Sequence, residues 1–265
     1  MTRVEFVWMP VSMRSTPATT ASGKVWPTTP WKRVWVCSCT WQKPRKRWNP
    51  AWIAPALALL SCHRLLNVPV CAAGCAHLPQ EDMTILGKKK ASAVATPAAA
   101  FQSGLNSTPI AACVKAGMNV ALGTGGAVDC GNMDLFETMR FATAQARLAG
   151  GDATAMPAAA ILMMATVCGA RAQGRADSCG MLKEGMDADI VLVDFSAPHL
   201  IPCHNVVNSL VFAAKGGDVA MTMVRGKILY QNGHFPTIDL KEVVEELTGY
   251  AIPKLFNEGK ETGEE

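Results

Sequence analysis

The stretch AGMNVALGTGGAVDCGNMDLFETMR, residues 116–140, constrains the fold of this chain more than any other. It begins with a short apolar run, Val120–Leu122, that ends in glycine. A strand that is buried on both faces has this pattern where it stops at the rim of a site. Residues 134–148 then carry apolar side chains at helical spacing, with Asp134 as the expected N-cap. A strand, a loop and a helix make one unit of a parallel α/β fold, in which chemistry sits at the carboxyl ends of the strands.

The run Val-Ala-Leu-Gly-Thr-Gly-Gly-Ala, residues 120–127, resembles the eighth barrel strand of the amidohydrolase superfamily. The resemblance covers roughly residues 65–256 and is strongest to the branch of chlorohydrolases and methylthioadenosine/S-adenosylhomocysteine deaminases. It implies an α/β fold: a partial TIM barrel formed by the C-terminal strands, and the C-terminal part of a small β-sandwich. It also implies metal-dependent hydrolysis of a C–N or C–Cl bond on a purine-like or triazine-like small molecule, with zinc or iron as the metal.

The chain departs from this family where the chemistry is expected. The family has an aspartate that binds the metal and transfers a proton at the position of Gly125, and a catalytic histidine at the position of Gly74. The family's first strand contributes a His-X-His pair, and no such pair occurs in this sequence. The resemblance therefore predicts a truncated pseudoenzyme with no intact catalytic residue and no cofactor of its own.

Four polar residues remain as candidates for a substrate pocket: His77, Thr124, Asp129 and Cys130. A lone histidine at a strand end more often has a structural role than a ligand role. Asp129, which aligns with a substrate-contacting serine of the family, is the weak candidate for a metal ligand. It follows the strand end by several residues, whereas a metal site tolerates only a few tenths of an ångström in ligand distance. The Gly-Thr-Gly-Gly run matches neither the Gly-X-Gly-X-X-Gly spacing nor that of the P-loop, so we do not predict a phosphate-binding loop.

The sequence divides into four regions. Residues 1–54 have no period and are predicted to be irregular, residues 55–175 to form the partial barrel, and residues 176–256 to form the sandwich piece and a C-terminal helix. Residues 257–265 are charged and predicted to be a disordered tail. Because only about three barrel strands can be placed, we expect a poorly stable fragment with exposed strand edges.

The composition of the N-terminal region is unusual, since all seven tryptophans lie in the first 52 residues and basic residues far outnumber the single acid, Glu5. A disordered basic tail and a nucleic-acid-binding arm are two interpretations. A third interpretation follows from the genetic code. Tryptophan has a single codon, so the DNA bases around each tryptophan are nearly fixed. In a shifted frame, residues 25–52 permit a string that resembles the His-X-Ala-Glu-Thr motif of the family's fifth strand. We favour this hypothesis, in which residues 1 to about 54 come from a frameshifted gene or a sequencing error.

The remaining composition limits location and partners. The ten cysteines contain no Cys-X-X-Cys spacing, which favours reduced thiols and a cytoplasmic protein. No apolar run approaches the ~18 residues that span a bilayer, so we expect no membrane partner. A net charge of +4 is too small to indicate nucleic acid. A homo-oligomer or a full-length paralogue is the expected protein partner. Three hypotheses stay open beside a non-functional product: an inactive relative, an active hydrolase with non-standard ligands, and a non-catalytic module that completes another subunit.

Overall fold

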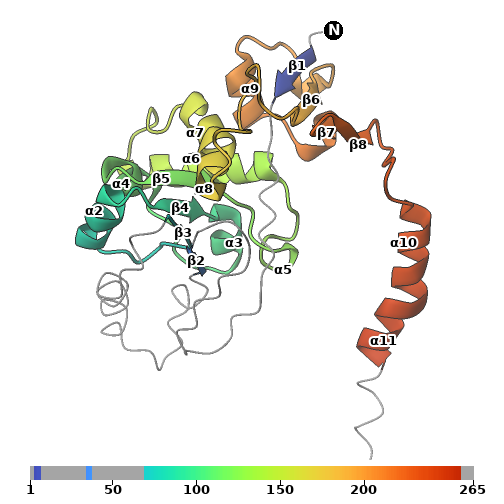
Figure 1. The fold of residues 1–265 in the computed structure, drawn as a ribbon, viewed down its shortest axis with the longest axis horizontal. Coiled ribbons are helices and arrows are strands. Elements are labelled where there is room, and N and C mark those ends of the chain that lie inside the picture. The colour runs from blue at the N-terminus through green and yellow to red at the C-terminus, as the bar shows by residue number, and fades with distance from the viewer. Residues whose placement is uncertain (1–2, 7–33, 38–68, 258–265) are drawn as a thin grey trace, which may run out of the picture.

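The computed structural model describes residues 3–6, 34–37 and 69–257, and two four-stranded sheets organise this part of the chain (Figure 1). The first sheet is parallel, with strand order β2-β3-β4-β5, and the second is antiparallel, with order β1-β6-β7-β8. The parallel strands are β2 (Val34–Cys37), β3 (Val70–Ala73), β4 (Ser92–Ala95) and β5 (Asn119–Leu122). The antiparallel strands are β1 (Arg3–Phe6), β6 (Ile190–Asp194), β7 (Val219–Val224) and β8 (Lys227–Gln231).

Both faces of the parallel sheet are covered, as buried parallel strands require. Because side chains alternate along a strand, Ala93, Val120 and Leu122 point to one face and join the main core. Val94 and Ala121 point to the other face and pack with Ala172. The helices of this region are α2 (Gln80–Lys88), α3 (Pro97–Gln102), α4 (Ile110–Lys115), α5 (Ala127–Cys130), α6 (Leu135–Gly150), α7 (Ala158–Ala165) and α8 (Val167–Gln173).

Helix α6 confirms the helix predicted for residues 134–148. The carboxylate of its N-cap, Asp134, accepts a hydrogen bond from the backbone N–H of Phe136 at 2.8 Å. Met139 and Ala142 lie on the buried face of the helix and belong to the main core. The helix ends at Gly151, which has a φ of +60°. Only glycine adopts this left-handed cap without steric cost, which explains why the helix stops there.

The prediction that residues 1–54 are irregular is wrong at two places. Strand β1 pairs with β6 in antiparallel orientation, and strand β2 pairs with β3 in parallel orientation. Short strands at a sheet edge are stabilised by backbone hydrogen bonds to an existing strand, so they need no side-chain period of their own. The rest of residues 1–54 and residues 258–265 of the predicted tail lie outside the described residues, whereas Asn257 ends a helix.

The antiparallel sheet contains the hairpin formed by β7 and β8. Its two turn residues, Arg225 and Gly226, have φ values of 48° and 78°. Positive φ at both central residues suits the right-handed twist of the flanking strands. The described residues hold one antiparallel sheet, and the parallel sheet is open rather than closed into a barrel. The remaining strands of the predicted barrel and a second sandwich layer are therefore not part of the described structure.

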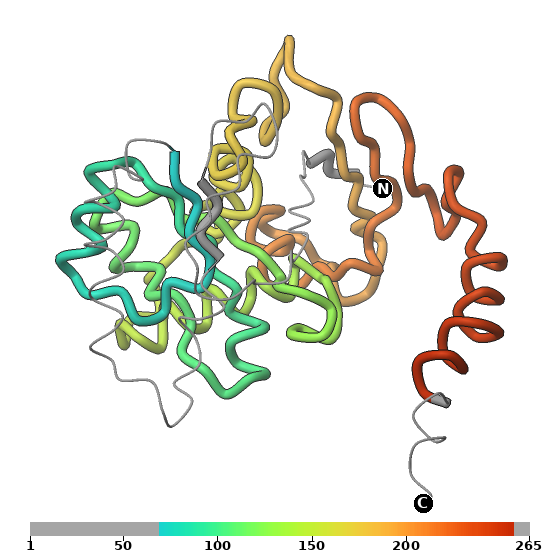
Figure 2. Tube along the Cα trace, turned by 60° about the horizontal axis from the view of Figure 1, so that its bottom comes forward, coloured from blue at the N-terminus to red at the C-terminus, as the bar shows by residue number. Residues whose placement is uncertain are grey.

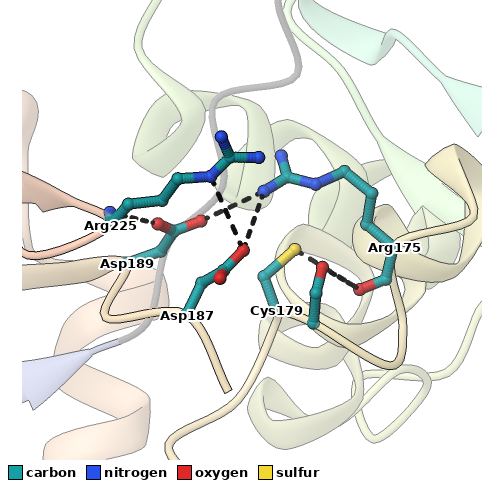
Figure 3. A network of polar contacts seen from close by, with 6 residues as sticks. Arg175, Cys179, Asp187, Asp189 and Arg225 are labelled. Carbon is teal, nitrogen blue, oxygen red and sulfur yellow. Dashed lines mark hydrogen bonds and ion pairs between the residues drawn. The ribbon is translucent and has the colours of Figure 1, made fainter. Parts of the chain in front are cut away.

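A network of two arginines and two aspartates joins the segment after α8 to the hairpin turn (Figure 3). The buried carboxylate of Asp189 accepts a hydrogen bond from the backbone N–H of Arg225 at 2.8 Å and lies 3.5 Å from the guanidinium of Arg175. Asp187 contacts the guanidinium groups of both Arg175, at 3.6 Å, and Arg225, at 3.8 Å. A buried carboxylate is tolerated only when it is paired in this way. The network therefore holds the residues just before β6 against the turn between β7 and β8.

Helix α6 forms a second junction, with the segment that runs from α9 (Val206–Phe212) to the short helix η4 (Gly216–Asp218). The other carboxylate oxygen of Asp134 accepts from the backbone N–H of Gly216 at 3.0 Å. Arg140 donates to the carbonyl of Ala214 at 2.6 Å, and the guanidinium of Arg147 lies 5.1 Å from the ring centre of Phe212. One face of α6 therefore carries three polar or cation–π contacts to the α9–η4 segment.

The described part of the chain ends in a helical segment that stands away from both sheets (Figures 1 and 2). It consists of α10 (Leu240–Glu246), the wide π turn η5 (Leu247–Ala251) and α11 (Ile252–Asn257). Elsewhere in the chain, a short 3₁₀ turn, η3 (Pro198–Leu200), precedes α9. Pro253 lacks the N–H that would continue the helical ladder, and the wide turn immediately before it accommodates this loss. Among the described residues, no helix has the length and apolar character needed to cross a bilayer.

Candidate active site

The carboxyl ends of the parallel strands meet at one edge of the sheet. The backbone N–H of Gly74, just after β3, donates to the carbonyl of Val94 at 3.2 Å. The N–H of Gly123, just after β5, donates to the carbonyl of Ala95 at 2.9 Å. Gly74 and the segment that leads to Gly125 therefore lie on the same edge, where parallel α/β proteins place their chemistry.

Gly74 and Gly125 both adopt backbone conformations that favour glycine, with φ values of 67° and 86°. At Gly125 a side chain would also lack space, because a Cβ atom would lie 3.0 Å from the Cβ of Ala99 on α3. Real Cβ atoms rarely approach a neighbour that closely. The backbone at this edge is thus arranged around glycine, and neither position offers a group that binds a metal or transfers a proton.

Thr124 lies between the end of β5 and Gly125, and its side chain is buried. Its hydroxyl donates a hydrogen bond to the carbonyl of Gly125 at 3.1 Å. A hydroxyl has a single O–H donor, and in Thr124 this local contact occupies it. Thr124 therefore stabilises the turn after β5 in the described structure.

Asp129 lies closer to Gly125 than their separation in sequence suggests. The single turn of α5 folds back over the glycines, so that the Cβ of Asp129 lies 3.7 Å from the place of a Cβ on Gly125. One carboxylate oxygen lies 3.3 Å from the corresponding place on Gly126. The side chain is exposed to solvent. The family has an aspartate at the position of Gly125. Asp129 is therefore a single carboxylate that lies next to that position.

A glutamine that the sequence analysis did not single out holds α5 in this position. The side-chain amide of Gln102, at the end of α3, donates to the carbonyl of Cys130 at 2.9 Å. No motif marks Gln102 in the sequence, because its partner lies 28 residues away along the chain. The position of Asp129 thus depends on a contact between α3 and α5.

Cys130 is buried, and its thiol hydrogen-bonds to the carbonyl of Asn132. Burial, together with the negative charge of Asp129, raises the pKa of the Cys130 thiol above its ordinary value. The thiol is therefore protonated at neutral pH. Metals and electrophiles react with the thiolate, so Cys130 in this state is a poor ligand and a poor nucleophile.

His77 lies in the loop between β3 and α2, and it is exposed. A tight turn precedes it, in which the N–H of Ala76 donates to the carbonyl of Gly74 at 2.7 Å. Within the described part of the chain, its ring forms no hydrogen bond or ion pair with Thr124, Asp129 or Cys130. The four candidate residues therefore share one edge of the sheet without forming a connected site.

The residues at this edge do not fit a catalytic metal. A zinc site takes three or four nitrogen, oxygen or sulfur ligands at about 2.0–2.3 Å. Residues 69–257 and the two N-terminal strands contain no group of three histidine, cysteine, aspartate or glutamate side chains that could hold an ion. A surface hollow of about 530 Å³ lies elsewhere, along the turn from Gly233 to Lys241. It is lined by consecutive residues of one segment and brings no catalytic group to the strand ends.

Comparison with known proteins gives a consistent picture. A sequence model of the amidohydrolase family matches residues 58–229. The chain is similar to a 5-methylthioadenosine/S-adenosylhomocysteine deaminase of Moorella thermoacetica, with 40% identity over 195 residues, which are 74% of this chain and 46% of the relative. It is also similar to a 5'-deoxyadenosine deaminase of Methanosarcina mazei, with 40% identity over 177 residues, which are 67% of this chain and 40% of the relative.

Two groups of solved structures resemble the chain. An adenosine deaminase from Xanthomonas campestris with bound zinc has a TM-score of 0.69 and 29% identity, over 73% of this chain and 45% of that one. An atrazine chlorohydrolase from Arthrobacter aurescens complexed with zinc has a TM-score of 0.62 and 25% identity, over 68% of this chain and 40% of that one. The chain thus spans just under half the length of the proteins that it matches.

Proposed function

Because the chain belongs to the amidohydrolase family, we propose that it is a deaminase-like member which does not itself catalyse the family reaction. The inherited activity is metal-dependent hydrolytic deamination or dechlorination of a purine-like or triazine-like ring. The observation that carries the proposal is the pair of glycines, Gly74 and Gly125, at the edge of the sheet where that reaction needs side chains.

The chemistry explains why these two positions matter. Hydrolytic deamination needs an activated water, and a bound metal supplies it by lowering the pKa of that water to about 7. It also needs a positioned acid or base that moves protons to the leaving amine. Gly74 and Gly125 supply neither group, and Asp129 is one exposed carboxylate. The donor set therefore supports an inactive chain with no cofactor of its own.

We propose the regions of the sequence analysis with one boundary moved: a barrel part at residues 55–175, a sandwich part with the C-terminal helix at 176–257, and a tail at 258–265. We propose a shifted frame in residues 1–54, and its support is the string that residues 25–52 permit in that frame, which resembles the family's His-X-Ala-Glu-Thr motif. Reading the coding DNA tests this. An open alternative frame across residues 25–52 is expected, and a stop codon in it would contradict the hypothesis.

The seven cysteines within residues 69–257 form no disulfide bond. Reduced cysteines are typical of proteins in a reducing compartment. They support our proposal that the chain resides in the cytoplasm.

A direct assay tests the proposed loss of activity. The purified chain is incubated with zinc and, in turn, with methylthioadenosine, 5'-deoxyadenosine and atrazine, and ammonia or chloride release is measured. The Moorella deaminase serves as the positive control for methylthioadenosine, and the Methanosarcina deaminase for 5'-deoxyadenosine. We expect no release above the protein-free rate. Release that scales with protein concentration and disappears in Asp129→Ala would instead support a hydrolase with non-standard ligands.

One observation favours a second candidate, a module that completes another subunit. Strand β5 is at the edge of the parallel sheet and pairs only with β4 among the described residues, although Val120, Ala121 and Leu122 are buried. An open strand edge is a site at which another chain can add a strand. Stoichiometric co-purification with a full-length paralogue from co-expressing cells would support this function, and absence of the complex would count against it.

A further inference from the structure

The C-terminal helical segment, residues 238–257, carries the densest group of exposed apolar side chains in the described structure. It holds nine of the twenty large apolar residues that are exposed there, and their exposed fractions run from 41% to 76%. Monomeric proteins rarely leave so much adjacent apolar surface in water. The nine residues are Ile238, Leu240, Val243, Val244, Leu247, Tyr250, Ile252, Leu255 and Phe256.

The spacing of these residues places most of them on one side of the helix. Leu240, Val244 and Leu247 recur at intervals of four and three residues, and Ile252 and Leu255 continue the pattern after the π turn. The three elements together span eighteen residues, or about 27 Å. Both views show that the segment projects from the body of the molecule, so the described chain does not cover this apolar stripe (Figures 1 and 2).

The charges beside the stripe favour a protein partner over a lipid surface. Membrane-surface helices typically carry lysine and arginine on their polar side. Here the first half of the segment carries Glu242, Glu245 and Glu246 with one lysine, Lys241, which lies 3.8 Å from Glu245. An acidic side is repelled by the anionic headgroups of a cell membrane.

We propose that this segment pairs in antiparallel orientation with the same segment of a second copy of the chain. A two-fold interface must be complementary to itself, and a stripe that is apolar along its length meets this condition. The charges select the orientation, because the first half of the segment is acidic whereas Lys254 lies in the second half. Antiparallel pairing brings Lys254 toward the glutamates of the other copy. Parallel pairing would instead place the acidic halves together.

The size of the stripe sets the strength of the pairing. A single helix of about 27 Å gives an interface at the small end of those seen between proteins, so we expect a reversible dimer with a dissociation constant on the order of micromolar. The segment lies away from the parallel sheet and from α5 (Figure 1). The dimer is therefore independent of the proposed loss of catalysis, and either proposal can fail without the other.

Sedimentation velocity of the full chain over a range of concentrations tests the dimer. We expect the average mass to rise from one chain, 28.2 kDa, toward twice that value. Leu247→Asp and Val244→Asp should each move the midpoint to at least tenfold higher concentration, since each places a charge in the apolar contact. Leu148→Asp is the matched control, because Leu148 is 86% exposed but lies on α6. Circular dichroism checks that each variant keeps its helix content.

A charge exchange tests the orientation. Lys254→Glu should weaken the dimer, and adding Glu246→Lys to the same chain should restore it, because each introduced glutamate then lies near an introduced lysine of the other copy. A mass of one chain at every concentration would overturn the proposal. A dimer or larger species that Leu247→Asp does not weaken would also overturn it, as would a double variant that dimerises no better than Lys254→Glu.

Discussion

At Gly74 and Gly125 the chain lacks the family's functional side chains, and the backbone conformation also favours glycine. Each has a positive φ, and Gly125 also faces the Cβ of Ala99 at 3.0 Å from where its own Cβ would lie. An active-site residue can usually be restored by one substitution if its backbone has kept the original conformation. Here the backbone and the neighbouring helix α3 are arranged around the glycine, so a restored side chain would meet strain.

Gly125→Asp should therefore not create a metal site. We expect substoichiometric zinc after equilibration and a loss of stability of about 1–2 kcal/mol, because the aspartate must adopt a left-handed conformation against Ala99. Elemental analysis and urea unfolding measure the two effects. Gly233→Asp is the matched control for left-handed strain, since Gly233 has a φ of 85° but nothing within 4 Å of its Cβ position. Stoichiometric zinc in Gly125→Asp would show that the site needs only this one residue.

The buried carboxylate of Asp189 should contribute more to stability than the nearby Asp187. Asp189→Asn leaves Arg175 without its buried partner and should lower the free energy of unfolding by about 2 kcal/mol. Asp187→Asn should cost less than ~1 kcal/mol, because that side chain is a third exposed and solvent screens its ion pairs. Urea unfolding followed by far-ultraviolet circular dichroism compares the two. Equal losses would contradict the role assigned to Asp189.

Two buried thiols predict a loss of stability in alkali. Burial, with smaller contributions from Cys113 and Cys71, raises the pKa of Cys75 to about 12, and burial raises the pKa of Cys113 to about 11. A free thiol has its pKa near 9.0. The folded state thus retains protons that the unfolded state loses, so stability is full below pH 9.0 and falls as the pH rises toward these values.

The test compares urea midpoints at pH 8 to 11, in the alkaline range set by those thiol pKa values, about 9 to 12. The double variant Cys75→Ala/Cys113→Ala should show a shallower decline than the unmodified chain, although its stability at neutral pH is lower. Cys203→Ala, at an exposed cysteine, should keep the original slope. Parallel slopes for all three proteins would mean that other groups cause the alkaline loss.

Among the secondary-structure elements, those with local signals could be predicted from the sequence. Helix α6 has Asp134 at its start and Gly151 at its end, and the β7–β8 hairpin has Arg225–Gly226 at its turn. Strands β1 and β2 could not be predicted, because each is four residues long and pairs with a strand far along the chain. The closeness of Ala99 to Gly125 and the hydrogen bond from Gln102 to Cys130 were missed for the same reason, since both depend on how α3 packs against the segment after β5.

The N-cap of α6 should be worth more than an ordinary cap. Asp134→Ala removes the bond to the N–H of Phe136 and also the bond to the N–H of Gly216, so we expect a loss of about 2 kcal/mol. Asn205→Ala is the matched control, since Asn205 caps α9 through the N–H of Asn208 and should cost about 1 kcal/mol. Thermal or urea unfolding compares them. A smaller loss for Asp134→Ala would mean that its contact with Gly216 adds nothing.

At the scale of the whole molecule, the described residues combine a family fold with an edge that does not fit the family's metal. Over 73% of its length the chain matches 45% of an adenosine deaminase that was solved with bound zinc. At the strand ends, nevertheless, the residues that the structure describes include no group of three potential ligands that could hold an ion. Fold and chemistry are separable in this way because packing depends on the many core residues, whereas catalysis depends on a few side chains.

Zinc binding is the measurement that tests this account most directly. The full chain is dialysed against excess zinc, passed over a desalting column, and its zinc and iron contents per chain are determined by elemental analysis, with the Moorella deaminase treated in parallel. The account predicts far less than one metal ion per chain, and the same value for Asp129→Ala. One tightly held ion per chain that is lost in Asp129→Ala would contradict it.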